Sequence, residues 1–183
     1  MSSNFISAVR GQHVSAAPVQ SFLDDNSFPD FTSSSLALFS LGPDVGRQVL
    51  AEVATELNKQ ACAELGFEPD EFEELGLAAQ IHPDSWSLGD QSPERAVQWF
   101  IERFPKNETI YNDLPKWYPI GFIGVAEANW REAGVVLVQY DAKEGEMTVR
   151  AILLDPSNAG AALISLRQGD DDFNNIKKFH EKS

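Results

Sequence analysis

Cysteine is the scarcest chemically useful residue in this chain. Of the 183 residues only Cys62 carries a thiol. A single cysteine cannot close a disulfide within the chain, and metal sites built on thiolates need more than one such ligand. The scarcity excludes a disulfide framework and is typical of proteins in a reducing compartment. We therefore expect a cytoplasmic protein.

Long apolar stretches are missing as well. No apolar run in the sequence approaches the ~20 residues that a helix needs to cross a bilayer. Residues 1–18 hold one basic residue, Arg10, and mix Ser, Gln and Gly among their apolar positions. A secretory signal has instead a positive start and a continuous apolar block. The sequence predicts neither a membrane-spanning helix nor export by that route.

Basic residues are few. Lys and Arg number 14 against 28 Asp and Glu, which gives a net charge of -14. Proteins bind nucleic acids and anionic lipids through clustered Lys and Arg, so neither is an expected partner here. A basic protein is the better expectation, because complementary potentials steer association. The alternative is that the acidity only keeps the protein soluble.

Motifs for cofactor chemistry are also absent. The sequence has no Gly-x-x-x-x-Gly-Lys-Ser/Thr phosphate loop, no dinucleotide-binding glycine pattern before a helix, and no Gly-x-Ser-x-Gly. His13, His82 and His180 are scattered, and none has a second ligand spaced to share a helix face with it. We expect no metal and no cofactor, and these absences favour a function other than catalysis.

Residues 1–34 are predicted to be a flexible, Ser-rich leader, because they follow neither a helical nor a strand period. Within it, residues 22–31 interleave acids with aromatics, as do segments that dock in a partner's groove. Alternatively, these aromatics pin the leader onto the domain. Residues 35–183 are predicted to form one domain, since two domains of this total length would each have a small core.

Two helices are predicted in the first part of this domain, at residues 43–65 and 93–104. Each has a proline at its start, where the missing N–H costs nothing, and apolar residues that recur every three or four positions. Gly66 is expected to end the first helix, because glycine readily takes the left-handed conformation common at helix ends. The apolar residues of 33–41 indicate a short strand before the first helix. Both helices are expected to cover the same face of one sheet.

That sheet is expected at about 120–166, with three or four mainly antiparallel strands, which makes the fold class α+β. Its clearest part is a hairpin of residues 134–141 and 147–154, and residues 161–166 are a candidate fourth strand. A C-terminal helix should follow, capped by acids at 170–172. The positions predicted to share its buried face are Phe173, Ile176 and Phe179.

The strongest local concentration of charge lies in the middle of the chain. Residues 43–104 hold 13 acids and 4 bases, a net -9 of the total -14. Within them a short proline-started helix carries the acids Asp70, Glu71, Glu73 and Glu74. The first two suit the positive end of a helix dipole, whereas the last two come too late in the helix for that. These four acids are the candidate contact surface for a basic partner, although a solvated charged face is the alternative.

One loop combines groups that could do chemistry. His82, Asp84, Ser85 and Trp86 bring an imidazole, a carboxylate, a hydroxyl and an indole within five residues. A histidine oriented by a carboxylate can act as a general base. Catalytic groups are nevertheless usually brought together by the fold, so a turn whose tryptophan packs on the core is the favoured interpretation.

These observations favour an acidic interaction domain that binds or masks a basic protein, in an inhibitor, immunity-type or adaptor role. One alternative is a small cytosolic enzyme with a carboxylate-lined cleft, using acids such as Glu73, Asp84 or Asp155. Another is a self-associating structural subunit, which would use exposed aromatics such as Trp117 and Trp130.

Overall fold

The computed structural model describes residues 2–15, 34–68, 78–82, 87–89, 92–102, 116–143, 146–168 and 172–182. Six strands and six helices lie within these ranges. In chain order they are α1 (Ser2–Val9), β1 (His13–Ser15), β2 (Ser35–Ser40), α3 (Arg47–Leu65), β3 (Ala79–Ile81), α5 (Pro93–Glu102), β4 (Trp117–Val125), α6 (Trp130–Ala133), β5 (Val135–Lys143), β6 (Glu146–Leu154), α7 (Ala159–Gln168) and α8 (Phe173–His180).

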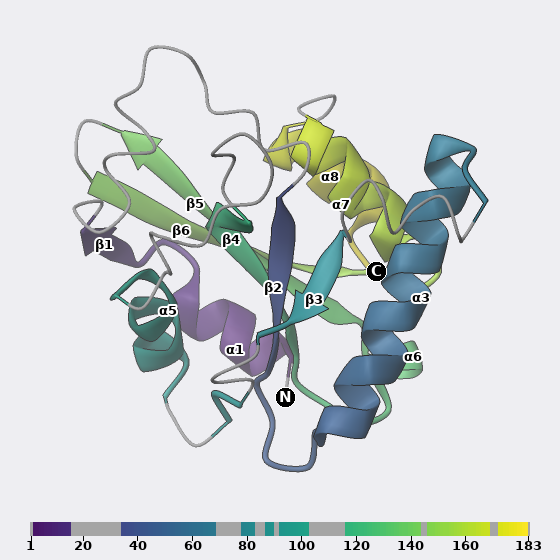
Figure 1. The fold of residues 1–183 in the computed structure, drawn as a ribbon. Coiled ribbons are helices and arrows are strands. Elements are labelled where there is room, and N and C mark those ends of the chain that lie inside the picture. Colours follow the sequence, from purple (N-terminus) through teal and green to yellow (C-terminus); the bar gives the residue numbers. More distant parts are fainter. Residues whose placement is uncertain are drawn as a thin grey trace.

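The strands form one mixed sheet in the spatial order β1-β6-β5-β4-β2-β3 (Figure 1). β2 runs parallel to both β3 and β4, whereas β4, β5, β6 and β1 are joined antiparallel. The α+β class is confirmed, but the prediction of three or four mainly antiparallel strands at 120–166 underestimates the sheet, which has six strands in the described residues and two parallel pairings. Parallel neighbours must be joined by long crossover connections, so no local turn signal in the sequence marks their pairing.

The predicted hairpin is present. β5 and β6 pair in continuous register from Val135↔Leu154 to Lys143↔Glu146. The prediction of a further strand at 161–166 is wrong, because these residues lie in α7. A short apolar run does not by itself distinguish a strand from a buried helix. Here Ala162, Leu163 and Leu166 recur at helical spacing and are buried against the sheet.

The N-terminal residues do not behave as a flexible leader where the structure describes them. Phe5, Ile6 and Val9 of α1 are buried, and Val14 of β1 is 5% exposed. β1 extends the sheet by pairing antiparallel with β6. The apolar spacing of α1 covers only two turns, too few to stand out as a period in a Ser-rich segment. Residues 16–33, including the aromatic and acidic stretch 22–31, lie outside the described residues.

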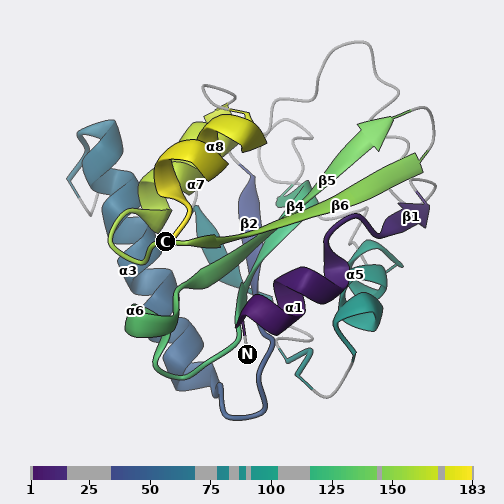
Figure 2. The same ribbon diagram turned by 180° about the vertical axis from the view of Figure 1, so that it is seen from behind.

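Helices cover both faces of the sheet (Figures 1 and 2). α1 and α5 pack on one face in a core rich in aromatics, whereas α3, α7 and α8 pack on the other in a mostly aliphatic core. The helices predicted at 43–65 and 93–104 therefore exist as α3 and α5, but on opposite faces rather than the same one. α3 begins at Arg47, four residues after the proline expected to start it.

α8 confirms the predicted C-terminal helix and corrects its orientation. The Asp172 carboxylate caps it by accepting hydrogen bonds from the backbone N–H groups of Asn174 and Asn175, at 2.8 and 2.9 Å. Phe173 and Ile176 are buried as expected, but Phe179 is 61% exposed. A spacing of three residues falls short of a full helical turn, so two such steps carry the third side chain off the buried face.

Candidate functional site

The four acids predicted to contact a partner, Asp70, Glu71, Glu73 and Glu74, lie outside the described residues, as do Asp84, Ser85 and Trp86. The described structure leads directly into the acidic segment through α3 and its end at residues 65–68. We therefore treat the C-terminal end of α3, with the segment 69–77 that follows it, as the candidate functional site. The contacts of α3 hold the described part of this site, which ends at Glu68.

The inner face of α3 is anchored by apolar packing. Leu50, Val53, Leu57 and Ala61 are all fully buried. α7 lies close against this helix at Gly160, where any Cβ would overlap the carbonyl oxygen of Leu57. The helices can approach so closely only because Gly160 has no side chain.

Two amides of α3 add polar anchors on either side. The Asn58 side chain both donates to the Ala79 carbonyl, at 2.9 Å, and accepts from the Ala79 N–H, at 3.1 Å. It thereby takes the place of a neighbouring strand at the edge of β3. Gln60 donates to the Pro156 carbonyl at 2.7 Å and accepts from the Gly160 N–H at 2.8 Å. These contacts fix α3 to β3 and to α7, and the helical period alone does not reveal them.

The C-terminal end of α3 has a defined backbone geometry. Gly66 adopts a left-handed conformation with φ 72°, as expected for the glycine that ends this helix. The N–H of Phe67 then bonds back to the Cys62 carbonyl at 3.1 Å, and the Cys62 thiol lies 3.0 Å from the Phe67 carbonyl oxygen. The backbone of Phe67 is thus held in place while its side chain remains 40% exposed.

Charge increases towards this end. Residues 43–68 carry five acids and two bases, and residues 69–77 add four acids and no base. Near the start of α3, Glu52 pairs with Arg131 at 3.7 Å. Glu64 and Glu68, which flank the turn at Phe67, are both exposed. The described site therefore combines an exposed aromatic side chain with two exposed acidic residues close to it in sequence.

His82 belongs to the core rather than to an accessible site. Its side chain is 8% exposed, and its ring is stacked on Phe39 with the centroids 5.5 Å apart. The rings of Trp117 and Trp99 also pack against it, with centroids 5.4 and 6.2 Å away. Residues 83–86, which include Trp86 of the predicted turn, lie outside the described residues, so that turn stays a prediction. The tryptophans that pack on His82 come from elsewhere in the chain. Sequence proximity did not indicate these ring partners.

The residues that would support the two alternative functions have structural roles where they are described. Trp117 and Trp130, proposed as exposed self-association aromatics, are each only 2% exposed, so that prediction is wrong. Asp155 forms a turn before α7 and accepts hydrogen bonds from the Ser157 N–H and hydroxyl, at 2.9 and 2.7 Å. These bonds favour the ionised carboxylate and lower the pKa of Asp155.

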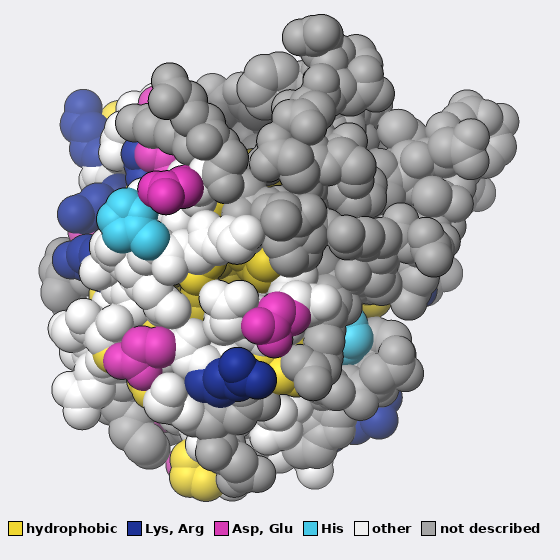
Figure 3. Space-filling model, turned by 90° about the vertical axis from the view of Figure 1, so that its left-hand side faces the viewer, with side chains coloured by type: hydrophobic (Ala, Val, Ile, Leu, Met, Phe, Trp, Pro, Cys, Tyr) yellow, Lys and Arg dark blue, Asp and Glu magenta, His cyan; other side chains and the backbone are white. Residues whose placement is uncertain are grey.

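Three further features of the described residues concern other classes of site. Among them, no group of three His, Cys, Asp or Glu side chains is arranged to hold a metal ion. On the face that carries β1 and α5, acidic, basic and hydrophobic side chains are interspersed rather than gathered by sign (Figure 3). None of the helices in the described ranges combines the length and the apolar character needed to cross a bilayer.

The chain matches no family model, no curated protein and no solved structure. Its function must therefore be argued from its own residues, chiefly from the anchored and acidic end of α3.

Proposed function

We propose that this protein is an acidic interaction domain that binds a basic protein partner through the C-terminal end of α3 and the acidic segment 69–77. The role would be that of an inhibitor, an immunity-type protein or an adaptor in the cytoplasm. The observation that carries the proposal is the placement of charge. Nine of the chain's 28 acids, and only two of its 14 bases, lie within residues 43–77.

The geometry of α3 supports this proposal. Binding sites on firmly packed elements lose less conformational entropy when a partner docks. α3 is held by a buried apolar face and by Asn58 and Gln60, so its acidic end is presented from a fixed base. Negative charge at such a surface raises the rate at which an oppositely charged partner is encountered.

Phe67 adds an apolar contact to the charged surface. Interfaces owe much of their affinity to a few aromatic or arginine side chains, while the charged rim mainly governs association rate. Phe67 is one of two large hydrophobic side chains that are exposed among the described residues. We expect it to insert into the partner while the surrounding carboxylates contact Lys and Arg.

Charge reversal at the site tests the proposal. A tagged form of the full chain would capture partners from a lysate at low salt, and elution at high salt would release those held by charge. Surface binding kinetics would then compare the parent with the double variant Glu73→Lys and Glu74→Lys. We expect association to slow about tenfold, because charge attraction accelerates encounter. The melting temperature should hardly change, since exposed charges contribute little to folding.

The matched control reverses two exposed acids elsewhere, Glu94→Lys and Glu146→Lys. Both double variants change the net charge from -14 to -10, so they differ only in where the charge is removed. Slower association for the first variant alone supports a localised acidic site. An equal effect of both variants, or of neither, would refute it.

A further inference from the structure

The outer surface of α8 has the opposite charge to the rest of the chain. Lys177, Lys178 and Lys182 lie in or just after this helix, and Arg10 reaches it by pairing with Glu181 at 3.8 Å. At the C-terminal end of α8, away from the exposed Asp172 that caps its start, these four cations and one carboxylate give a local net charge of +3. That leaves -17 for the remainder of a chain with a total of -14. A concentrated basic surface is therefore unusual for this molecule.

The positive charge at Lys177 and Lys178 is not neutralised within the described structure. Glu181 is engaged by Arg10, and the Lys182 ammonium group donates to the carbonyl of Glu132. Neither Lys177 nor Lys178 has a carboxylate within ion-pair distance among the described residues. These two ammonium groups remain available for an anionic ligand.

An exposed aromatic side chain lies beside them. Phe179 is 61% exposed, the most of any large hydrophobic side chain in the described part of the protein. The Lys178 ammonium group lies 4.8 Å from the centre of its ring, which keeps cation and ring together as one surface. The outer surface of α8 thus offers apolar and positive contacts side by side.

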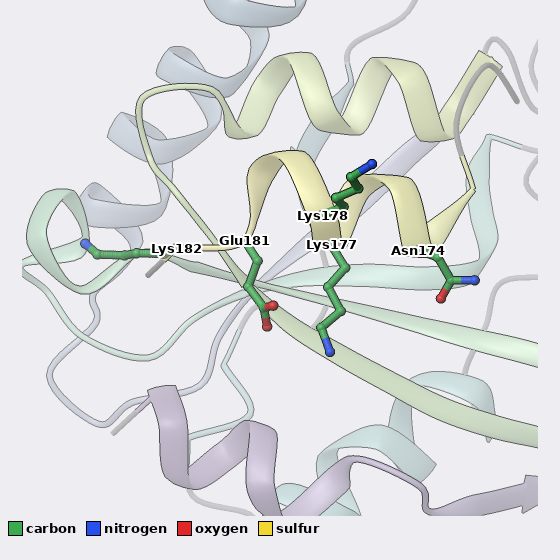
Figure 4. A pocket seen from close by; sticks show the side chains of 5 residues that line it. All are labelled: Asn174, Lys177, Lys178, Glu181 and Lys182. Carbon is green, nitrogen blue, oxygen red and sulfur yellow. The ribbon is translucent and has the colours of Figure 1, made fainter.

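The same surface is hollowed. Asn174, Lys177 and Glu181 project to one side of α8, towards α1, and Lys178 projects to the other (Figure 4). Together with Lys182 they line an open hollow of about 490 Å³. Such a hollow can receive side chains of a peptide, and its polar lining includes the unpaired Lys177.

Helix stability explains only part of this arrangement. Cations in the last turn interact favourably with the negative end of a helix dipole, which accounts for the sign of Lys177 and Lys178. The dipole gives no reason for a phenylalanine at the neighbouring exposed position. Interfaces favour exposed aromatic side chains, and lysines beside them add charge complementarity to an acidic partner.

We propose that the outer surface of α8 binds an acidic protein segment that carries an aromatic or aliphatic side chain. Lys177 and Lys178 would contact its carboxylates, and Phe179 would contact its apolar side chain. A short acidic segment fits better than a nucleic acid or an anionic membrane. Those extended polyanions would also meet the remaining -17 of the chain and be repelled by it.

A peptide-binding measurement on the full chain tests this proposal. The probe is a fluorescein-labelled peptide with the sequence of residues 68–76, which has five acids, a phenylalanine and a leucine. Fluorescence anisotropy would report its binding to the parent and to the double variant Lys177→Gln and Lys178→Gln. We expect the double variant to bind about tenfold more weakly, as removal of two charge contacts implies. Adding Phe179→Ser to this double variant should weaken peptide binding further, because the apolar contact is lost as well.

The matched control is Arg47→Gln with Lys59→Gln, two exposed cations on α3. Both double variants shift the net charge from -14 to -16, so general repulsion of the peptide is the same in each. Weaker binding in the α8 variant than in the α3 variant supports the proposal. Equal binding by the two variants, or no binding of the peptide to the parent, overturns it.

Discussion

α3 and α8 present the same kind of surface with opposite charge. Each places an exposed phenylalanine beside side chains of one sign: Phe67 beside Glu64 and Glu68, and Phe179 beside Lys177 and Lys178. Their attachment differs greatly. α3 has 19 residues, five buried side chains and two anchoring amides, whereas α8 has 8 residues and buries only Phe173 and Ile176. An exposed aromatic side chain beside charges of one sign can therefore occur on a helix with extensive buried contacts or on one with few.

The largest effect should come from the inner face of α3. Leu57 is fully buried against the sheet and α7, so Leu57→Ala should lower the free energy of unfolding by about 2–5 kcal/mol through lost burial and the cavity left behind. Chemical denaturation would measure it. On the outer surface of α8, Phe179→Ser should change this free energy by less than about 0.5 kcal/mol. Similar losses for both variants would remove the distinction between inner and outer surfaces.

The polar anchors of α3 should contribute less than its core, but measurably. Asn58→Ala leaves the Ala79 N–H and carbonyl without their side-chain partner, which should cost about 1–3 kcal/mol of unfolding free energy. Thermal and urea unfolding would both report it. Thr55→Ala removes only an exposed hydrogen bond on the same helix and serves as the control. If both variants unfolded alike, Asn58 would have no anchoring role.

For α8 the corresponding contribution is its cap. Asp172→Ala removes the carboxylate that accepts two backbone N–H groups at the start of the helix, and should cost about 1 kcal/mol. Asp172→Asn retains a capping oxygen and should recover most of the loss. Circular dichroism during denaturation would follow it. If Asp172→Ala unfolded at the same denaturant concentration as the parent and Asp172→Asn, the cap would not be needed for stability.

The smallest expected effect depends on pH. Hydrogen bonds from Ser157 lower the pKa of Asp155 in the folded protein. A lowered pKa means that the folded chain holds this proton less tightly than the unfolded chain, so the turn is stabilising above the usual Asp range. That stabilisation is lost as the pH falls through the lowered pKa. The unfolding free energy of Asp155→Asn should therefore converge with that of the parent at acidic pH, whereas a constant difference would exclude this cause.

The sequence predicted those parts of the fold that depend on neighbouring residues. The β5–β6 hairpin, the cap at Asp172 and the helix end at Gly66 each follow from a local signal, such as a turn, an acid before a helix or a glycine after one. The parallel pairing of β2 with β3 and β4 depends on residues far apart in the chain. No periodicity encodes that pairing, so the sheet was predicted too small.

The candidate site divides in the same way. Its charge could be counted directly, because net charge is additive along a sequence. The amide contacts of Asn58 and Gln60 and the exposure of Phe67 and Phe179 could not be predicted, since they depend on which face each helix turns to the sheet. The exposure expected of Trp117, in β4, and of Trp130, in α6, was wrong because the burial of each ring depends on tertiary packing that the local sequence does not show.

The most direct test of an acidic binding surface at the end of α3 is the dependence of the association rate on salt. The captured basic partner would be mixed with the parent and with the Glu73→Lys, Glu74→Lys variant over a range of ionic strengths. We predict that the association rate of the parent falls steeply as salt rises, because screening acts over ~8 Å at physiological ionic strength. The association rate of the variant should fall less steeply. Equal rates for the two proteins at every ionic strength would contradict the proposed function.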